Sequence, residues 1–367
     1  MAQAIDSALA QTHENVEVIV VDDGSTDGSR EIILSYGNRV KPVFKVNGGQ
    51  ASTFNAGFRN SAGKFICYLD ADDLLLPQAV ESSVRLFEEG NIVKVHWPMF
   101  IINGNNEKSG KLIPKDGILD GDRREIVLSE GPFHNWHHNP PTSGNIWADW
   151  FLEKILPIPE NQFRLGADGY LHTIAPIYGV VRSTDEPLGY YRVHTSNNYF
   201  LKKLDDKTVK FYQQRFEDYF VGFQEHFRSQ GIEVDPDSWK VKNYNYLWLQ
   251  RLLDARNDVK SKIPNDSLLT VIDSNELGEQ FLPGYDVRPF LELDGQYAGA
   301  PINDESAIME VERQKASGSK YLLLWWTSFW WFEHYREFTT YLDVNYRRIL
   351  DNERLVAFAL ADRRQSQ

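Results

Sequence analysis

The sequence predicts an α/β fold in which helices cover a largely parallel sheet. The first observation is that short apolar runs alternate with segments of helical period from the first residue to Gly90. The second is that two of these runs end abruptly in carboxylates, at Asp22-Asp23 and at Asp70-Ala71-Asp72-Asp73. Because ligands bind at the carboxyl ends of the strands in such sheets, the two acidic strand ends are expected to share one crevice.

The elements of the first part of the chain follow from its periodicity and its punctuation. Apolar spacing predicts a helix over Ala2–Ala10 and a strand over Val16–Val21. The turn Asp22–Asp27 is rich in helix-capping residues and precedes a predicted helix. The further elements are expected in this order: a helix over Ser29–Tyr36, a strand over Val40–Val46, a helix from Gly49 through Asn60, a strand over Phe65–Leu69 and a helix over Pro77–Glu89.

The rest of the chain divides into three parts. Residues 90–198 are irregular and rich in aromatics, Asn, Gly and Pro, which is typical of long functional loops. We expect a first α/β domain over residues 1–200, a helical connector over 201–260 and a small α/β domain over 261–367. The last domain should contain strands at Leu268–Ile272 and Tyr321–Trp325 and a helix over Asp304–Ser317.

Charge and cysteine content exclude several classes of protein. With 39 basic and 52 acidic residues the net charge is −13, which argues against binding to nucleic acid or to an anionic membrane. Cys67 is the single cysteine, so an internal disulfide and a cysteine zinc site are both excluded. The longest apolar run, Tyr321–Phe332, is too short to span a membrane, so we expect no transmembrane segment. Our interpretation is a cytoplasmic protein, either free or peripheral at the inner face of the membrane.

The second acidic cluster points to a metal. Asp70 and Asp72 flank one small residue, so both carboxylates can converge on one point, where they would repel each other. A hard divalent cation, Mg²⁺ or Mn²⁺, relieves such repulsion and is commonly completed by substrate phosphates. The Asp22-Asp23 turn is more ambiguous, because it suits a helix cap as well as it suits contact with a base or a ribose.

In order and spacing these motifs resemble family 2 glycosyltransferases of the GT-A fold. The resemblance rests on V-I-V-V-D-D-G-S-T-D, then G-G-Q…N-A-G-F-R-N-S-A-G-K-F, then Y-L-D-A-D-D, and it covers roughly Ala2–Asn198. It implies a nucleotide-sugar donor, a glycan or lipid-linked acceptor, a divalent cation and inversion at the anomeric centre. It also implies donor contacts from Asp22, Asp23, Gly49, Gln50, Asp70 and Arg192, and metal ligands Asp70, Asp72 and His194.

The resemblance also places a general base. The segment F-R-L-G-A-D-G-Y resembles the family's acidic motif before a helix, with Ala167 where relatives commonly carry an acid. We therefore expect Asp168 to deprotonate the acceptor hydroxyl; the alternative is that it only caps a helix. The preceding loop from His134 lacks metal-ligand spacing, so we expect no zinc there. Its end should form the polar floor of the sugar and acceptor pocket, from Thr142, Ser143, Gly144 and Asn145.

Three further expectations complete the interpretation. The aromatic cluster from Trp325 to Tyr335 could stack on sugars, but burial in a core or an interface is the stronger reading. The sequence starts inside the helix that, in the family, follows a first central strand, so we expect that strand to be absent and donor binding to be weak. The rivals are a nucleotidyltransferase, disfavoured by the lack of a Gly/Arg/Lys-rich phosphate loop, and a degenerate scaffold acting as a glycan-binding module.

Overall fold

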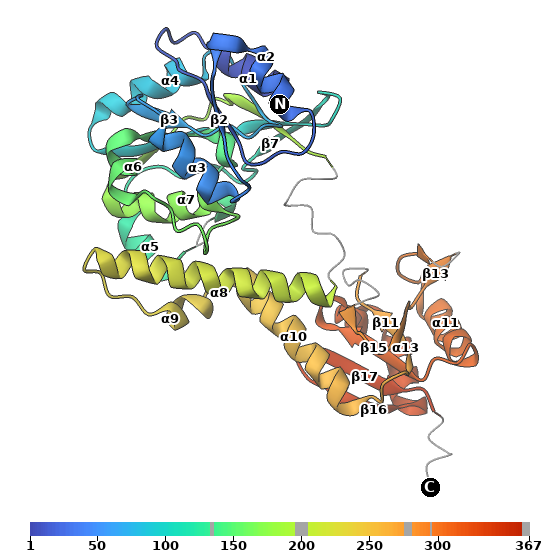
Figure 1. The fold of residues 1–367 in the computed structure, drawn as a ribbon. Helices are drawn as coiled ribbons and strands as arrows, with labels where there is room; N and C mark the ends of the chain where they lie inside the picture. The colour runs from blue at the N-terminus through green and yellow to red at the C-terminus, as the bar shows by residue number, and fades with distance from the viewer. Residues whose placement is uncertain (133–135, 195–204, 275–280, 294–295, 362–367) are drawn as a thin grey trace. The chain divides into compact units, whose positions relative to one another are not determined.

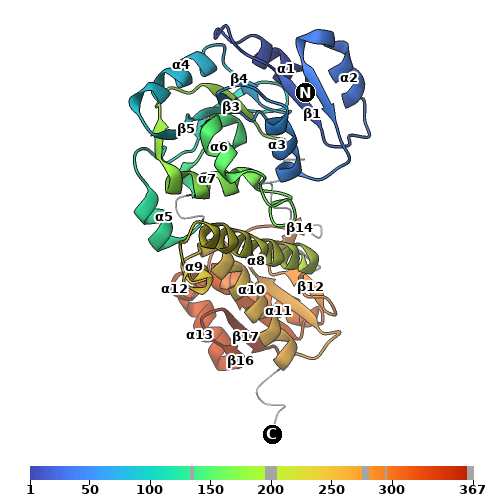
Figure 2. The same ribbon diagram turned by 60° about the vertical axis from the view of Figure 1, so that its left-hand side comes forward.

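The structure, a computed structural model, describes residues 1–132, 136–194, 205–274, 281–293 and 296–361 (Figure 1). The chain forms two compact units. The first comprises Met1–Phe200 and Arg215–Asn243, and the second comprises Leu201–Gln214 and Tyr244–Gln367. Figure 2 colours the chain by residue number, from blue at the N-terminus to red in the second unit's last strands.

The early elements of the first unit lie where the periodicity predicts them. Helix α1 (Ala2–Leu9) precedes strand β1 (Ile19–Asp22), and α2 (Ser29–Ser35) precedes β2 (Lys41–Phe44). The two strands pair in parallel, with Ile19 opposite Lys41. The next elements are α3 (Gln50–Arg59), β3 (Phe65–Cys67), β4 (Leu74–Leu75) and α4 (Ala79–Leu86). Each predicted element is present, although the strands are shorter than the apolar runs.

The sheet that contains β3 is not largely parallel, so that part of the prediction is wrong. Its order is β3-β8-β5-β9, with β5 at Ile92–His96, β8 at Asn145–Ala148 and β9 at Val180–Ser183. Strand β8 runs antiparallel to both β3 and β5, whereas β5 and β9 are parallel. Strand β8, which follows β5 by about fifty residues in the chain, lies between β3 and β5 in the order of the sheet. Strands β1 and β2 form a separate two-stranded sheet.

Residues 90–194 are more regular than their sequence suggests. A further sheet has the order β4-β10-β6-β7, with β6 at Met99–Ile102, β7 at Lys108–Ile113 and β10 at Gly189–Arg192. Three helices also fall in this region: α5 (Arg124–Glu130), α6 (Asp149–Ile155) and α7 (Ala167–Tyr178). Strand β5 and most of α7 are buried on all sides, so neither shows the alternation of polar and apolar residues by which exposed elements are recognised.

The core of the first unit lies around β5. Trp97, Met99 and Ile146 are at most 1% exposed and pack together with Leu75 and Leu188. Burying each such side chain contributes about 1.5–3 kcal/mol of stability. Cys67 packs against the same cluster, and burial raises the pKa of its thiol to about 12.

The expected helical connector consists of three helices. They are α8 (Asp206–Ser229), α9 (Pro236–Lys240) and α10 (Tyr244–Lys262). From Arg215 onward, α8 belongs to the first unit together with α9, whereas α10 belongs to the second. Among the helices in the described ranges, none is both long and apolar enough to cross a membrane.

The second unit is built on a five-stranded sheet of order β12-β11-β15-β17-β16. Its strands are β11 (Leu268–Ile272), β12 (Asp286–Pro289), β15 (Tyr321–Trp325), β16 (Arg347–Asp351) and β17 (Leu355–Ala359). Helices α11 (Asp304–Ala316) and α13 (Arg336–Asn345) pack on it through a core that includes Leu322, Phe338 and Phe358. Trp325, Trp331 and Tyr335 are at most 4% exposed, so the core reading of the aromatic cluster is confirmed for them.

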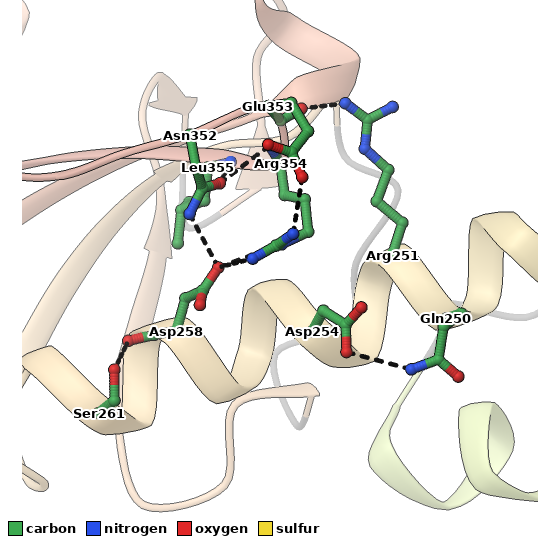
Figure 3. A network of polar contacts seen from close by, with 9 residues as sticks. All are labelled: Gln250, Arg251, Asp254, Asp258, Ser261, Asn352, Glu353, Arg354 and Leu355. Atoms are coloured by element: carbon green, nitrogen blue, oxygen red, sulfur yellow. Dashed lines mark hydrogen bonds and ion pairs between the residues drawn. The ribbon is translucent and has the colours of Figure 1, made fainter.

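Helix α10 is fastened to the β16–β17 turn by one carboxylate (Figure 3). Asp258 Oδ2 accepts hydrogen bonds from Asn352 Nδ2 at 3.0 Å and from Arg354 Nη2 at 3.0 Å. About two turns earlier along the helix, Arg251 donates to the carbonyl oxygen of Glu353. Strand-turn and helix are therefore held by polar contacts as well as by apolar packing.

Candidate active site

The turn after β1 is occupied by its own hydrogen bonds. Asp22 is 2% exposed; its carboxylate pairs with Arg30 Nε at 2.7 Å and accepts from Ser25 N at 3.0 Å. Burial alone would raise the pKa of Asp22, but the hydrogen bonds from Ser25 and Arg30 bring it below the ordinary value. Asp22 therefore stays ionised and anchors the turn that leads into α2.

Asp23 ties this turn to the start of α3. Its two carboxylate oxygens accept from Gly48 N at 2.8 Å and from Gly49 N at 2.7 Å, and it forms an ion pair with Lys45. Gly49 has φ +83°, and a Cβ there would contact the backbone of Arg164, so a glycine is required on both grounds. The aspartate thus shapes a glycine turn that lies against the Arg164 backbone.

Gln50 links the glycine turn to the helix that carries Asp168. Its backbone N–H donates to Arg164 O at 2.7 Å. Its Oε1 accepts from Gly166 N at 2.8 Å and from Ala167 N at 3.0 Å, which satisfies donors at the start of α7. Its Nε2 lies 3.3 Å from Thr142 Oγ1. In this structure Gln50 connects three segments of the site.

Thr142 and Ser143, which we expect to form a polar floor of the pocket, make hydrogen bonds to both acidic segments. The Thr142 hydroxyl donates to Asp168 Oδ2 at 3.3 Å. The Ser143 hydroxyl donates to Asp73 Oδ2 at 2.7 Å and accepts from Asp70 N at 3.0 Å. Asn145 stabilises the backbone of this loop, since its Nδ2 donates to Pro141 O and to Thr142 O. Gly144 is needed because a Cβ would lie 2.6 Å from Pro140 Cβ.

The environment of the carboxylates at this floor disfavours their ionised forms. Burial raises the pKa of Asp70 well above its ordinary value, and the nearby charges of Asp73, Asp168 and Asp72 raise it further. Burial also raises the pKa of Asp73 to about 7, although hydrogen bonds from Arg192 N and Ser143 oppose the rise. A group of acids in this state would be stabilised by a cation.

His194 and Arg192 reach this cluster from β10 and the residues after it. His194 Nε2 lies 2.9 Å from Asp72 Oδ2, and both side chains are partly exposed. Arg192 is 9% exposed and donates from its backbone to Asp73 Oδ1 at 2.9 Å. Its guanidinium donates within the protein, to Asp72 O, Asn103 O, Asn106 Oδ1 and Gln3 Oε1. Residues 195–198, which follow His194, lie outside the described residues, as do His134 and Asn135.

Asp168 lies in the first turn of α7, beside the floor. It is 9% exposed, and its Oδ1 accepts from Gly169 N at 2.9 Å. Burial raises its pKa, while Gly169 N, Thr142 and the charge of Arg215 act in the opposite direction. The structure thus brings Asp168 together with Asp70 through Thr142, and Asp70 with Asp73 through Ser143.

Comparison with known proteins identifies the segment that carries the acidic strand ends. The family model described as "Glycosyl transferase family 2" matches residues 1–142. This part of the chain belongs to glycosyl transferase family 2. The matched segment has an α/β fold, as predicted. The match includes Asp22, Asp23, Asp70 and Asp72, whereas Asp168 and His194 lie beyond it.

Relatives and solved structures show the extent of the likeness. An uncharacterized glycosyltransferase of Nostoc sp. is 36% identical over 203 residues, 54% of this chain and 62% of the relative. A chondroitin synthase of Pasteurella multocida is 40% identical over 263 residues, 71% of this chain and 24% of the relative. The S. aureus TarS 1–349 structure in complex with UDP has 17% identity and a TM-score of 0.43, covering 71% of each chain. The chain thus spans less than two thirds of these two relatives.

Two residues near the candidate site were not predicted to take part in it. Tyr191 on β10 faces the acids, and burial together with the charge of Asp73 raises the pKa of its hydroxyl to about 12. Lys94 on β5 is 1% exposed; its Nζ lies 2.8 Å from His172 Nδ1 and donates to Asn139 Oδ1 at 2.9 Å. A lysine inside an apolar strand was the available sign, because a buried lysine requires partners.

The side chains at the candidate site suit a divalent cation whose remaining ligands come from substrate. Within the described ranges, no group of three or more His, Cys, Asp or Glu side chains is arranged to hold a metal. His194 nevertheless contacts Asp72, and Asp70 lies close enough to Asp72 for that charge to raise its pKa, so two carboxylates and one imidazole are near one another. Magnesium and manganese sites in which phosphates supply the remaining ligands have this incomplete character.

Proposed function

We propose that the chain transfers a sugar from a nucleotide-sugar donor to a glycan or lipid-linked acceptor, with a divalent cation and with inversion. The observation that carries the proposal is the convergence of Asp70, Asp72 and Asp168 around the Thr142–Ser143 floor. Membership of residues 1–142 in glycosyl transferase family 2 supports the reaction class. Two relatives are named chondroitin synthase and hyaluronan synthase; both products are glycans, which favours a glycan acceptor.

Asp70, Asp72 and His194 would hold the cation together with the donor's diphosphate. When bound, the cation neutralises charge on the diphosphate as it leaves. The backbone N–H of Asp70 donates to the Ser143 hydroxyl, whereas the Asp72 side chain is partly exposed and contacts His194. Asp22 and Asp23 would shape the nucleotide side of the site, since their carboxylates order the β1–α2 turn and the Gly48–Gly49 turn.

Asp168 would act as the general base. Its Oδ1 is held by Gly169 N and its Oδ2 by Thr142, so its orientation is set before the acceptor arrives. The acceptor oxygen would form a bond to the anomeric carbon while its proton passes to Asp168, and the bond from that carbon to the diphosphate oxygen would break. Buried carboxylates with raised pKa values suit this role, because a base is most effective when its pKa approaches the working pH.

The test is nucleotide release from a panel of nucleotide-sugars with Mn²⁺, in the presence and absence of oligosaccharide acceptors. Wild type should release nucleotide from at least one donor, and acceptor should raise the rate. Asp72→Ala and Asp168→Asn should each lower kcat by about 10²–10⁴-fold. Unchanged turnover in both variants would refute the mechanism. Donor or glycan binding without any release would instead favour a binding module on this scaffold.

A further inference from the structure

A helix beyond the matched segment contacts the loop that carries Asp168. Tyr219 on α8 is 3% exposed, and its hydroxyl donates to the carbonyl oxygen of Leu165 at 2.5 Å. The same hydroxyl accepts from Arg215 Nε, one turn earlier on the helix. The Tyr219 ring stacks on Phe163 with centroids 5.0 Å apart and planes inclined by 6°. One side chain of α8 therefore holds both the start and the middle of the loop.

The fit between α8 and this loop leaves no room for a side chain at Gly166. That residue has φ +81° and precedes α7. A Cβ there would contact the Tyr219 hydroxyl and would lie 3.0 Å from Arg215 Nη2. The guanidinium of Arg215 thus lies beside Gly166, which precedes Asp168 by two residues. Figure 1 shows α8 running beside α7, and Tyr170 on α7 also stacks on Phe223 of α8 with centroids 5.9 Å apart.

The other side of the loop is held by the family 2 segment. Gln50 of α3 accepts from the backbone of Gly166 and Ala167, as described above. The loop is consequently held on one side by Gln50 of the matched segment and on the other by Tyr219 and Arg215 of α8. Loss of the contacts on either side would loosen the first turn of α7, where Asp168 lies.

Several charged and titratable groups surround the Asp168 carboxylate from the neighbouring elements. They are Lys94 on β5, Asp70 after β3, Tyr191 on β10, and Arg215 and Tyr219 on α8. The charge of Arg215 lowers the pKa of Asp168, against the effect of burial. Arg215 therefore contributes charge as well as contact.

We propose that Tyr219 and Arg215 are positioning residues that hold the Leu165–Asp168 loop in the geometry needed for proton abstraction. The inference rests on the proposed function and extends it, because it assigns part of the site to a helix that the family model does not include. It predicts that these side chains affect the chemical step and not donor binding, since both contact the loop on the base side of the site.

The kinetic test uses Tyr219→Phe, Arg215→Gln and Arg215→Lys in the full chain. Tyr219→Phe keeps the ring that stacks on Phe163 and removes only the hydroxyl. We expect kcat to fall about 10- to 100-fold in Tyr219→Phe and Arg215→Gln, with donor KM unchanged within twofold. Arg215→Lys should recover part of the loss. The control is Arg228→Gln, which removes a charge from an exposed position of the same helix and should behave as wild type.

A second measurement does not depend on turnover. Amide hydrogen exchange in peptides covering residues 163–169 should become at least tenfold faster in Tyr219→Phe, and should stay unchanged in Arg228→Gln. An unchanged kcat or an unchanged exchange rate in Tyr219→Phe would each overturn the inference, as would a rise of donor KM that accounts for the loss. Failure of the proposed function is separate, because it would appear as full activity in Asp168→Asn.

Discussion

The hydroxyl of Ser143 donates to the buried carboxylate of Asp73 at a distance of 2.7 Å. The same oxygen accepts from Asp70 N at 3.0 Å, so one small side chain orders two residues of the acidic segment. Neither a larger nor an apolar side chain could replace it, because Ser143 itself is fully buried. The polar residue Ser143 is therefore needed to hold Asp70 and Asp73 in place.

Ser143→Ala should destabilise the first unit by about 1–3 kcal/mol, because it leaves a buried carboxylate and a buried backbone N–H each short of one partner. Urea unfolding measures the effect, with Ser35→Ala on the exposed face of α2 as the control. Equal stability of the two variants would show that water replaces the hydroxyl.

Removing the cation should destabilise the wild-type chain in the presence of donor. Binding of Mn²⁺ and nucleoside diphosphate to the folded state alone adds about 2.7 kcal/mol at 100 times the dissociation constant. Thermal unfolding with Mn²⁺ and then with excess EDTA gives the difference. Asp72→Asn should abolish this difference in unfolding temperature, since Asp72 contacts His194 at the proposed metal site. An undiminished difference in the variant would show that the metal binds elsewhere.

Gly49→Ala should cost about 2 kcal/mol of folding free energy, and more if the Arg164 backbone cannot move. The residue has φ +83°, and a Cβ would contact the Arg164 carbonyl. Gly28→Ala is the matched control, because its φ is −74° and nothing lies within 4 Å of the added carbon. Equal unfolding midpoints for the two variants would contradict the close approach seen at Gly49.

Stability should fall between about pH 6.5 and pH 4, and His226 should carry part of the fall. Burial lowers its pKa to about 4, so in this window the unfolded chain binds a proton that the folded chain does not. The loss from this residue should be about 2 kcal/mol after allowance for partial exposure, complete at about pH 4. His226→Gln cannot titrate but keeps polar groups near Tyr170 and Tyr178, so its stability should depend less on pH. Parallel pH profiles of the two proteins would refute this.

The parts that the sequence predicts well are those set by local pattern. The α3 helix begins at Gln50 after a glycine pair, and β3 ends before Asp70, as the apolar run and its acidic end indicate. The acids proposed for the site were chosen for the same reason, because a carboxylate at the end of an apolar strand is visible in the order of residues alone. Thr142 and Ser143 were chosen from their place between Asp72 and Asp168, and the structure places them in contact with Asp168 and Asp73.

The parts that were missed depend on contacts between distant segments. The direction of β8 follows from its pairing with strands distant in the sequence, which has no local signature. Gln50 is expected to contact the donor, and its hydrogen bond to Gly166 N at the start of α7, 116 residues away, has no local sequence signal. Tyr219 lies on a helix that the resemblance did not reach, and only the fold brings it to Leu165.

The single thiol of this chain has a practical consequence. Cys67 packs against the core of the first unit, and its raised pKa keeps it protonated and unreactive at neutral pH. A cysteine introduced at an exposed position would then be the only site that a maleimide dye modifies. Thr26→Cys, in the exposed turn between β1 and α2, would carry a fluorophore that reports nucleotide arrival without any background labelling to subtract.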